Sequence, residues 1–341
     1  MANDKRYAIG VDVGGTNTAT GLVDADGKIR GELSFKTKDY PVFEDYIERI
    51  CQDIEALKRN QGAGTEVIGI GIGAPNANYF SGVAENPVNL YWYEREKGGE
   101  KGQRIERIPF VEMLKRHYPS IPVVIDNDAN AAAIGEMIYG GAKGMKDFIE
   151  ITLGTGLGGG VVSNGLMTYG YDGTAGELGH VIVRPGGRQC GCGRRGCLET
   201  YVSATGIKRT MLQILSDDMR PSRLRAFTVD EIDSKLIDDA AREGDELALE
   251  AFRQTGMYLG EALANYVAVT YPEAIFLFGG LAKAGRLIFE PTKKYMEENL
   301  LFNYKGKVKL LPSGIDDDAN AAILGTSALV WQELKKRSLN A

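Results

Sequence analysis

The sequence VDVGGTNTATGLV at residues 11–23 has a partner at residues 151–163, which read ITLGTGLGGGVVS. Each stretch predicts an apolar strand, a glycine-rich turn and a second strand. A second pair, DNDANAAAIGE at 126–136 and DDDANAAILGT at 316–326, repeats with similar spacing. Chance similarity of glycine-rich turns is the alternative for the first pair alone. Together, the two pairs predict two copies of one α/β unit that face each other across a cleft.

The composition is that of a globular protein with two domains. The chain has 341 residues, of which 43% are hydrophobic and 25% charged. Its net charge of −6 argues against nucleic acid as a partner, because such proteins need basic side chains to meet the phosphates. We find no apolar stretch that predicts a membrane span and no signal peptide, so we expect a cytoplasmic protein with no membrane partner.

Periodicity and turn residues predict the other elements of the chain. Residues 91–108 are charged and contain glycines, which is typical of an exposed loop. A helix at about 42–58 places Cys51 on its apolar face, as expected of a buried small hydrophobe. Strands are expected at 67–72, 123–125, 274–278 and 308–311, helices near 109–117 and from 129, further helices over most of 204–270, and a last helix after Asp318.

The first glycine turn predicts a phosphate-binding hairpin. Glycines let the backbone approach a phosphate, and the N–H groups and the Thr16 hydroxyl can then donate to its oxygens. Asp12, at the strand end, could hold Mg²⁺ through water. The turn at 154–156 leads into a strand rather than a helix, so its GxGxxG-like spelling does not indicate a Rossmann site. The candidate phosphate-binding residues of the two turns, with the possible Mg²⁺ partner Asp12, are Asp12, Gly14, Gly15, Thr16, Asn17, Thr18, Gly154, Thr155 and Gly156.

Three polar residues, Asp126, Asn127 and Asp128, stand between an apolar strand and an alanine-rich helix. One of them is expected to cap the helix, and a cap alone is the structural alternative for this motif. Ligands bind α/β sheets at the carboxyl ends of strands. A carboxylate there could accept a hydroxyl proton during phosphoryl transfer, and Asn127 could hydrogen-bond a neighbouring sugar hydroxyl.

A metal-ligand pattern begins at Gly176-Glu177-Leu178-Gly179-His180 and continues with Cys190, Cys192 and Cys197. One histidine and three cysteines form the ligand set of a tetrahedral, structural zinc site, with no open position for catalysis. A disulfide is the poorer alternative, because it would leave one of the three cysteines unpaired. Zinc would order a loop that otherwise lacks a core.

These motifs together resemble the ROK family of repressors, open reading frames and sugar kinases, over essentially the whole chain. The resemblance rests on D-x-G-G-T near the amino terminus, N-D-A-N before a helix, and G-H followed by C-x-C-G-x-x-G-C-x-E. It implies a two-domain actin/hexokinase-like ATPase fold with duplicated RNase H-like domains. The implied domains are residues 1–125 plus 326–341, and residues 126–325 with a zinc loop at 180–197. The C-terminal helix would return to pack on the first domain.

The resemblance also implies the roles of single residues. Asp128 would be the base that takes the proton from the phosphorylated hydroxyl. His180 would use one ring nitrogen for zinc and the other for the sugar, so that zinc fixes the orientation of a recognition residue. The implied sugar-hydroxyl partners are Asn127, Glu177, His180 and Glu199, and Gly279 and Gly280 would lie beneath the adenosine of ATP.

We therefore expect an ATP- and Mg²⁺-dependent hexose kinase that phosphorylates glucose and forms a homodimer in solution. Kinases for fructose, mannose or an N-acetylhexosamine share these motifs. Residues 74–78 and 91–108 depart from the family pattern near the expected sugar entrance, which affects substrate identity. A sugar-responsive repressor would need a helix-turn-helix ahead of the sugar-binding domain. We expect the first strand to begin by about residue 7, which leaves no room for such a module, so the sequence disfavours a repressor.

Overall fold

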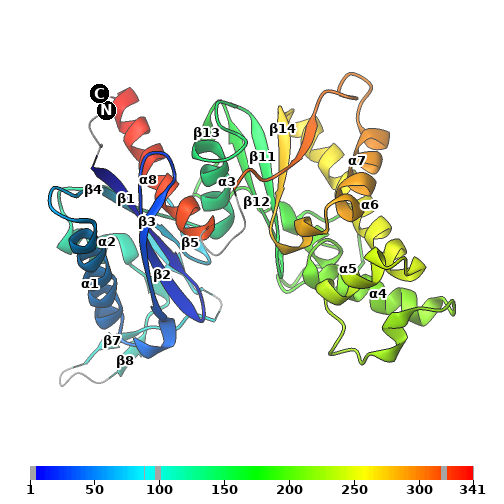
Figure 1. Cartoon of the computed structure of the whole chain (residues 1–341), viewed down its shortest axis with the longest axis horizontal. Coiled ribbons are helices and arrows are strands. Elements are labelled where there is room, and N and C mark those ends of the chain that lie inside the picture. Colours follow the sequence, from blue (N-terminus) through cyan, green and yellow to red (C-terminus); the bar gives the residue numbers. More distant parts are fainter. Residues whose placement is uncertain (1–4, 88, 97–100, 316–320, 341) are drawn as a thin grey trace. The chain divides into compact units, whose positions relative to one another are not determined.

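The computed structural model describes residues 5–87, 89–96, 101–315 and 321–340. Its chain forms two compact units, and Figure 1 labels most of their elements. Unit 1 consists of Met1–Gly144, Tyr169–Ala175 and Gly314–Ala341, and unit 2 consists of Met145–Thr168 and Gly176–Ser313. The echo at 316–326 begins in residues 316–320, which lie outside the described residues.

Unit 1 is built on a five-stranded sheet with the order β10-β4-β1-β2-β3. Strands β1, β2 and β3 form an antiparallel meander, and β4 and β10 extend it in parallel from β1. The parallel strands are almost continuously apolar, as expected of strands covered on both faces. The bounds are β1 Arg6–Val13, β2 Asn17–Val23, β3 Ile29–Lys36, β4 Glu66–Gly73 and β10 Val123–Asp126.

Helices α1 (Phe43–Gln61) and α8 (Ala321–Asn340) cover opposite faces of this sheet, as Figure 1 shows. Successive side chains of β1 point to opposite faces of the sheet, and each face is covered by one of these helices. Ile9 and Val11 join the core cluster that contains the buried face of α1. Gly10, between them, faces α8, where an added Cβ would overlap the carbonyl oxygen of Ile323. The expected return of the C-terminal helix to the first domain is thus confirmed.

Unit 2 repeats the topology of unit 1. Its sheet order is β13-β12-β11-β14-β15, with an antiparallel meander from β11 to β13 and with β14 and β15 parallel to β11. The predicted duplication is confirmed by this match. The bounds are β11 Phe148–Leu153, β12 Leu157–Ser163, β13 Leu166–Met167, β14 Ala274–Phe278 and β15 Lys309–Pro312.

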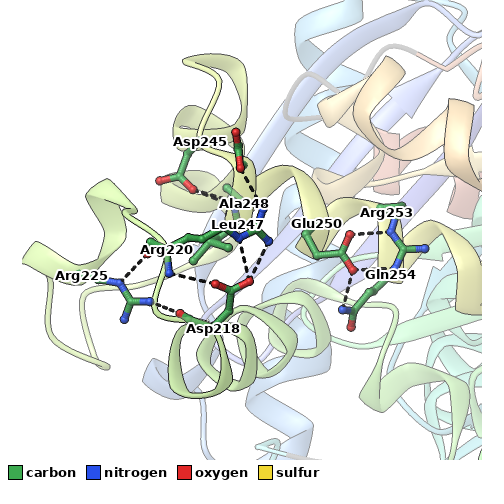
Figure 2. Close-up of polar contacts among 10 residues, drawn as sticks. Asp218, Arg220, Arg225, Asp245, Leu247, Ala248, Glu250, Arg253 and Gln254 are labelled. Atoms are coloured by element: carbon green, nitrogen blue, oxygen red, sulfur yellow. Dashed lines mark hydrogen bonds and ion pairs between the residues drawn. The ribbon is translucent and has the colours of Figure 1, made fainter.

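The helices of unit 2 surround the long helix α6 (Glu246–Thr270). Gly256 and Gly260 of α6 let α7 approach closely, because a Cβ on either would meet the backbone of Thr292. Asp245 caps α6 by accepting hydrogen bonds from the amides of Leu247 and Ala248, as Figure 2 shows. Such a cap contributes about 1 kcal/mol. The other helices are α4 Ala204–Asp217, α5 Ser234–Arg242 and α7 Arg286–Asn299.

Ion pairs on the surface of unit 2 tie the segment after α4 to α6. Arg220 pairs with Asp218 at 2.7 Å and with Glu246 at 2.9 Å. Arg225 donates to the carbonyl of Asp218, and Glu250 pairs with Arg253 along α6 (Figure 2). Exposed pairs of this kind add little stability, so we regard the network as fixing the path of the connection.

The segment 91–108 differs from the exposed loop predicted by its composition. Its described residues include the short strands β7 (Tyr93–Arg95), β8 (Lys101–Arg104) and β9 (Arg107–Ile108). Trp92 is 1% exposed and packs against Phe43, Tyr46 and Phe110 in unit 1. One buried tryptophan thus anchors a charged segment, of which residues 97–100 lie outside the described part. The small strands β5 Ala77–Asn78 and β6 Val83–Glu85 and helix α2 Phe110–His117 complete this side of unit 1.

The compact units also differ from the domain boundaries predicted at 125/126 and 325/326. Helix α3 (Asp128–Ile138) belongs to unit 1 because it packs on α8. Gly135 and Gly325 allow this close approach, and a Cβ on Gly135 would lie 3.0 Å from the Cα of Gly325. None of the helices in the described ranges is long and apolar enough to cross a membrane.

Candidate functional site

Three parallel strands of unit 1 end side by side at one edge of the sheet. Asp12 of β1 pairs with Gly73 of β4, and Gly73 pairs with Asp126 of β10. Carboxylates therefore flank a residue without a side chain at the carboxyl edge, where α/β sheets bind their ligands. The sequence predicted Asp12 at a strand end, and the register now places it one strand away from β10, which leads to Asp128.

Asp128 is the first residue of α3 and lies over Gly73, where an added Cβ would be 3.6 Å from its Oδ1 atom. The residue keeps access to water. The protein around it nevertheless desolvates the carboxylate and raises its pKa to about 7, and the negative charge of Asp12 adds to the increase. A carboxyl group with a pKa near neutrality suits a general base.

Asp12 has a pKa raised to about 6 by burial. Among the described residues, no side chain donates a hydrogen bond to its carboxylate. A desolvated carboxylate without a donor is suited to a cation, so this residue fits the expected magnesium site. The second negative charge, on Asp128, favours a cation at this edge as well.

Asn127 is the N-cap of α3, as one residue of the polar triplet was expected to be. Its backbone is extended, and its side-chain oxygen accepts a hydrogen bond from the amide of Asn130 at 2.8 Å. The oxygen is therefore engaged in the cap. The side-chain NH₂ group is the part of Asn127 that could donate to a sugar hydroxyl.

The β1–β2 hairpin carries the first predicted phosphate turn. The amide of Gly14 donates to the carbonyl of Asn17 at 3.0 Å, and a Cβ on Gly14 would lie 2.8 Å from that oxygen, so the turn requires glycine. Thr16 and Asn17 are exposed, and Gly15 is half-buried. Their amides and side chains are placed where a phosphate could reach them.

Thr18 differs from the other residues of this turn because its side chain is fully buried. Its hydroxyl contacts those of Thr37 at 2.9 Å and Tyr46 at 2.7 Å, and Thr37 donates to the carbonyl of Gly14 at 2.7 Å. Thr18 therefore braces the hairpin from within. Sequence reasoning missed Thr37 and Tyr46, whose spacing from the turn gives no signal of this contact.

The second predicted phosphate turn lies in unit 2, between β11 and β12. Gly154 and Thr155 are exposed, and the amide of Gly154 donates to the carbonyl of Gly156 at 3.1 Å. Gly279 ends β14 beside this turn, with a positive φ of 96° and a Cβ position 2.8 Å from the carbonyl oxygen of Leu153. Only glycine fits there without strain. The structure thus brings Gly279 and the exposed Gly280 next to the turn at 154–156.

The predicted zinc ligands lie together in unit 2. The ligand atoms of His180, Cys190, Cys192 and Cys197 are all within 4.8 Å of one another. The sulfurs of Cys192 and Cys197 are 3.6 Å apart, and the sulfur of Cys190 lies 3.7 Å from Nδ1 of His180. Ligands of tetrahedral zinc, with bonds of about 2.0–2.3 Å, stand about 3.3–3.8 Å apart. All four cysteines of the chain are free thiols, so these residues fit a structural zinc ion.

The zinc group connects to the predicted sugar partners. His180 turns Nδ1 towards Cys190, while its Nε2 lies 3.9 Å from Glu177, whose side chain is exposed. Glu199 accepts a hydrogen bond from the amide of Leu157 at 3.2 Å and faces the sulfur of Cys190 at 3.3 Å. Glu199 thereby joins the metal group to the glycine turn of the same unit.

The two units thus share one sheet topology, and this duplication is that of the actin/hexokinase-like ATPase fold. The ROK family model matches residues 8–333, and the chain belongs to the ROK family. It is 33% identical to the glucokinase of Thermotoga maritima over 333 residues, which cover 97% of this chain and 99% of that protein. 

A solved structure gives the same picture. A ROK family glucokinase from Streptomyces griseus, in complex with glucose and AMPPNP, is 31% identical with a TM-score of 0.73, covering 96% of this chain and 99% of that one. Repressors are more distant relatives. The putative xylose repressor of a Caldicellulosiruptor species is 26% identical, and the match covers 96% of this chain and 78% of the repressor.

Proposed function

We propose that this protein phosphorylates glucose, using ATP with Mg²⁺ as the phosphate donor. The observation that carries the proposal is Asp128, a solvent-accessible carboxylate at the carboxyl edge of a sheet, with its pKa raised to about 7. The fold and the similarity to glucokinases support the same reaction.

In the proposed reaction, the oxygen of the sugar's 6-hydroxyl group attacks the γ-phosphorus, and ADP leaves. Asp128 accepts the proton of that hydroxyl group. The exposed amides of the two glycine turns would hold the phosphate oxygens. When bound near Asp12, Mg²⁺ supplies charge neutralisation for the transferred group. Positioning and electrostatic stabilisation account for most of the rate in this chemistry.

The sugar partners that we propose are Asn127 in unit 1 and Glu177, His180 and Glu199 in unit 2. The observed direction of the His180 ring supports this assignment, because Nδ1 faces the cysteines and Nε2 remains for a hydroxyl. Bound zinc would fix the tautomer and the ring orientation of His180. The metal would therefore affect sugar recognition without taking part in the transfer.

A sugar panel with coupled detection of ADP release tests the proposal. We expect the highest kcat/KM with glucose, and lower values with fructose, mannose and N-acetylglucosamine. A higher kcat/KM with another sugar would make that sugar the proposed substrate, and the proposal of kinase activity would stand. No ADP release with any sugar, at saturating MgATP and with zinc bound, would remove the kinase proposal.

The proposal also includes a homodimer and a cytoplasmic location. ATP is available in the cytoplasm, and a reducing compartment keeps cysteine ligands such as those of the metal group in the thiol form. Light scattering of the purified protein would decide its oligomeric state, and a monomer at micromolar concentration would remove the dimer from the proposal.

A further inference from the structure

A buried tyrosine contacts the carboxylate two residues before Asp128. The hydroxyl of Tyr169 donates to Oδ2 of Asp126 at 2.8 Å. Asp126 is 1% exposed and Tyr169 is 7% exposed, so water competes little for this hydrogen bond. A hydrogen bond to a buried charged group is among the stronger ones in proteins.

The other oxygen of Asp126 organises the start of α3. Oδ1 accepts hydrogen bonds from the backbone amide of Asn127 and from the side chain of Asn130, both at 2.9 Å. Asp128 lies in the chain between these two residues. The direction of the Asp128 side chain therefore depends on a turn that is stabilised by the hydrogen bonds to Asp126.

Tyr169 is itself held by a stack of aromatic rings. Its ring lies parallel to that of Tyr79, with 4.4 Å between centroids and 8° between planes. Lys336 of α8 places its ammonium group 5.0 Å from the Tyr169 centroid and 4.5 Å from that of Tyr79. The position of the Tyr169 hydroxyl is thus fixed independently of Asp126.

Charges around Asp126 are consistent with an ionised acceptor. Burial raises the pKa of Asp126 to about 6, and hydrogen bonds from Asn130 and Tyr169 together with the charge of Lys336 act against that increase. The carboxylate can therefore accept from Tyr169, Asn127 and Asn130 at neutral pH, as the geometry requires.

We propose that Tyr169 is a positioning residue for phosphoryl transfer, which acts through Asp126 to fix the turn that aims the carboxylate of Asp128. This inference rests on the function proposed above. A small misplacement of a reacting group can reduce a rate about a hundredfold, so a group that sets the direction of the base should affect kcat. It should leave the binding of ATP unchanged.

Two tyrosine-to-phenylalanine variants separate this role from packing. Tyr169→Phe removes the hydroxyl and keeps the ring stack. Tyr79→Phe is the matched control, because its ring belongs to the same stack while its hydroxyl donates to Glu333 of α8 at 2.8 Å. The measurements are kcat, KM for glucose, KM for MgATP and the melting temperature of each variant.

We expect Tyr169→Phe to lower kcat about tenfold, which corresponds to the loss of one charged hydrogen bond. KM for MgATP should stay within about twofold of the wild type. Tyr79→Phe should keep kcat within about twofold at a similar melting temperature. Equal losses in the two variants, or an unchanged kcat in Tyr169→Phe, would overturn the inference.

Two further measurements make the test specific. In an Asp128→Asn background, Tyr169→Phe should cause no further loss of kcat, because the group that it aims is gone. A second tenfold loss there would show a general structural effect and overturn the inference. Hydrogen exchange at the amide of Asn127 should accelerate in Tyr169→Phe and not in Tyr79→Phe.

The exchange measurement needs no turnover. If the wild-type protein phosphorylates no sugar, the proposed function fails. Unchanged exchange at Asn127 in Tyr169→Phe would then separately exclude the link from Tyr169 to the turn before Asp128.

Discussion

Units 1 and 2 have the same sheet topology, but different side chains stand at the ends of their strands. In unit 1, the edge at which β1, β4 and β10 end carries Asp12, Asp126 and, two residues later, Asp128. In unit 2, Thr152 holds the position that matches Asp12 in the repeated sequence, and Gly279 follows the neighbouring strand β14. The acidic repeat at 316–318, which follows β15, lies outside the described residues. Among the described residues, the strand ends of unit 1 thus present carboxylates, and those of unit 2 present a glycine turn close to the metal group. The comparison teaches that a duplicated fold can divide its chemistry between the copies.

The largest effect expected from this division is the loss of the base in unit 1. Asp128→Asn should lower kcat by at least about a hundredfold. The fold should be no less stable at pH 8, because the raised pKa means that ionisation of Asp128 works against the folded state as pH rises from about 4 through 7. Coupled ADP release and thermal unfolding measure both effects.

The matched control is Asp230→Asn, which removes an exposed carboxylate of unit 2. It should leave kcat unchanged. Near-normal turnover in Asp128→Asn would break the comparison, because the charged edge of unit 1 would then have no part in the reaction.

The metal group of unit 2 should have the next largest effect. Cys197→Ala removes a buried ligand, and we expect loss of bound zinc and a reduction in kcat/KM for glucose of about tenfold to a hundredfold. KM for MgATP should change less, because the group adjoins predicted sugar partners. Metal content by mass spectrometry and steady-state kinetics test this.

Cys51→Ala provides the control for that variant, since Cys51 is the one cysteine outside the cluster and packs in unit 1. It should retain zinc and normal kinetics. Full affinity for glucose in zinc-free Cys197→Ala would show that the recognition role does not belong to unit 2.

The two glycine turns allow a matched test of smaller effect. Gly14→Ala places a Cβ 2.8 Å from the carbonyl oxygen of Asn17, whereas Gly154→Ala meets nothing within 4 Å. Gly14→Ala should therefore lower the free energy of unfolding by about 1–3 kcal/mol. Gly154→Ala should change it by less than about 1 kcal/mol.

Both variants should raise KM for MgATP severalfold if phosphates approach both turns. Urea denaturation and initial-rate kinetics give the two quantities. An unchanged KM in Gly154→Ala alone would confine phosphate binding to the hairpin of unit 1 and sharpen the comparison.

The smallest expected effect concerns the charges that unit 1 places together. Because burial and Asp12 raise the pKa of Asp128 to about 7, kcat/KM should rise with pH through that region and level off above it. Asp12→Asn removes the like charge and should lower the pKa of Asp128 by roughly half a pH unit in the protein without Mg²⁺. Carbon-13 NMR of the carboxyl group measures this directly. An unchanged pKa would mean that burial alone sets it.

Much of the fold could be predicted because it depends on local patterns. The strands near 67–72, 123–125 and 274–278, the cap at the start of α3 and the gathering of His180 with three cysteines all follow from sequence spacing. The resemblance to the ROK family, confirmed over residues 8–333, added the residue roles, which stay predictions.

Contacts between distant parts of the chain could not be predicted. Trp92 makes a charged segment part of the core of unit 1, and no local pattern marks it as a core residue. The position of Thr18 next to the glycine turn predicted a phosphate contact, whereas its buried hydroxyl is hydrogen-bonded to the hydroxyls of Thr37 and Tyr46. The contact of Tyr169 with Asp126 spans 43 residues and has no signature in the sequence. Such contacts depend on tertiary packing rather than on propensity.

Helix α8 has a consequence for the order in which the chain folds on the ribosome. It packs on β1 and β4 so closely that Gly10 and Gly71 leave no room for a side chain beneath it. Strands β1 and β4 must therefore wait for α8, which is synthesised after the strands of unit 2. The strands of unit 2, at 148–312, are complete before that moment. We expect the second sheet of this protein to mature before the first, the reverse of the usual amino-terminal-first order of synthesis.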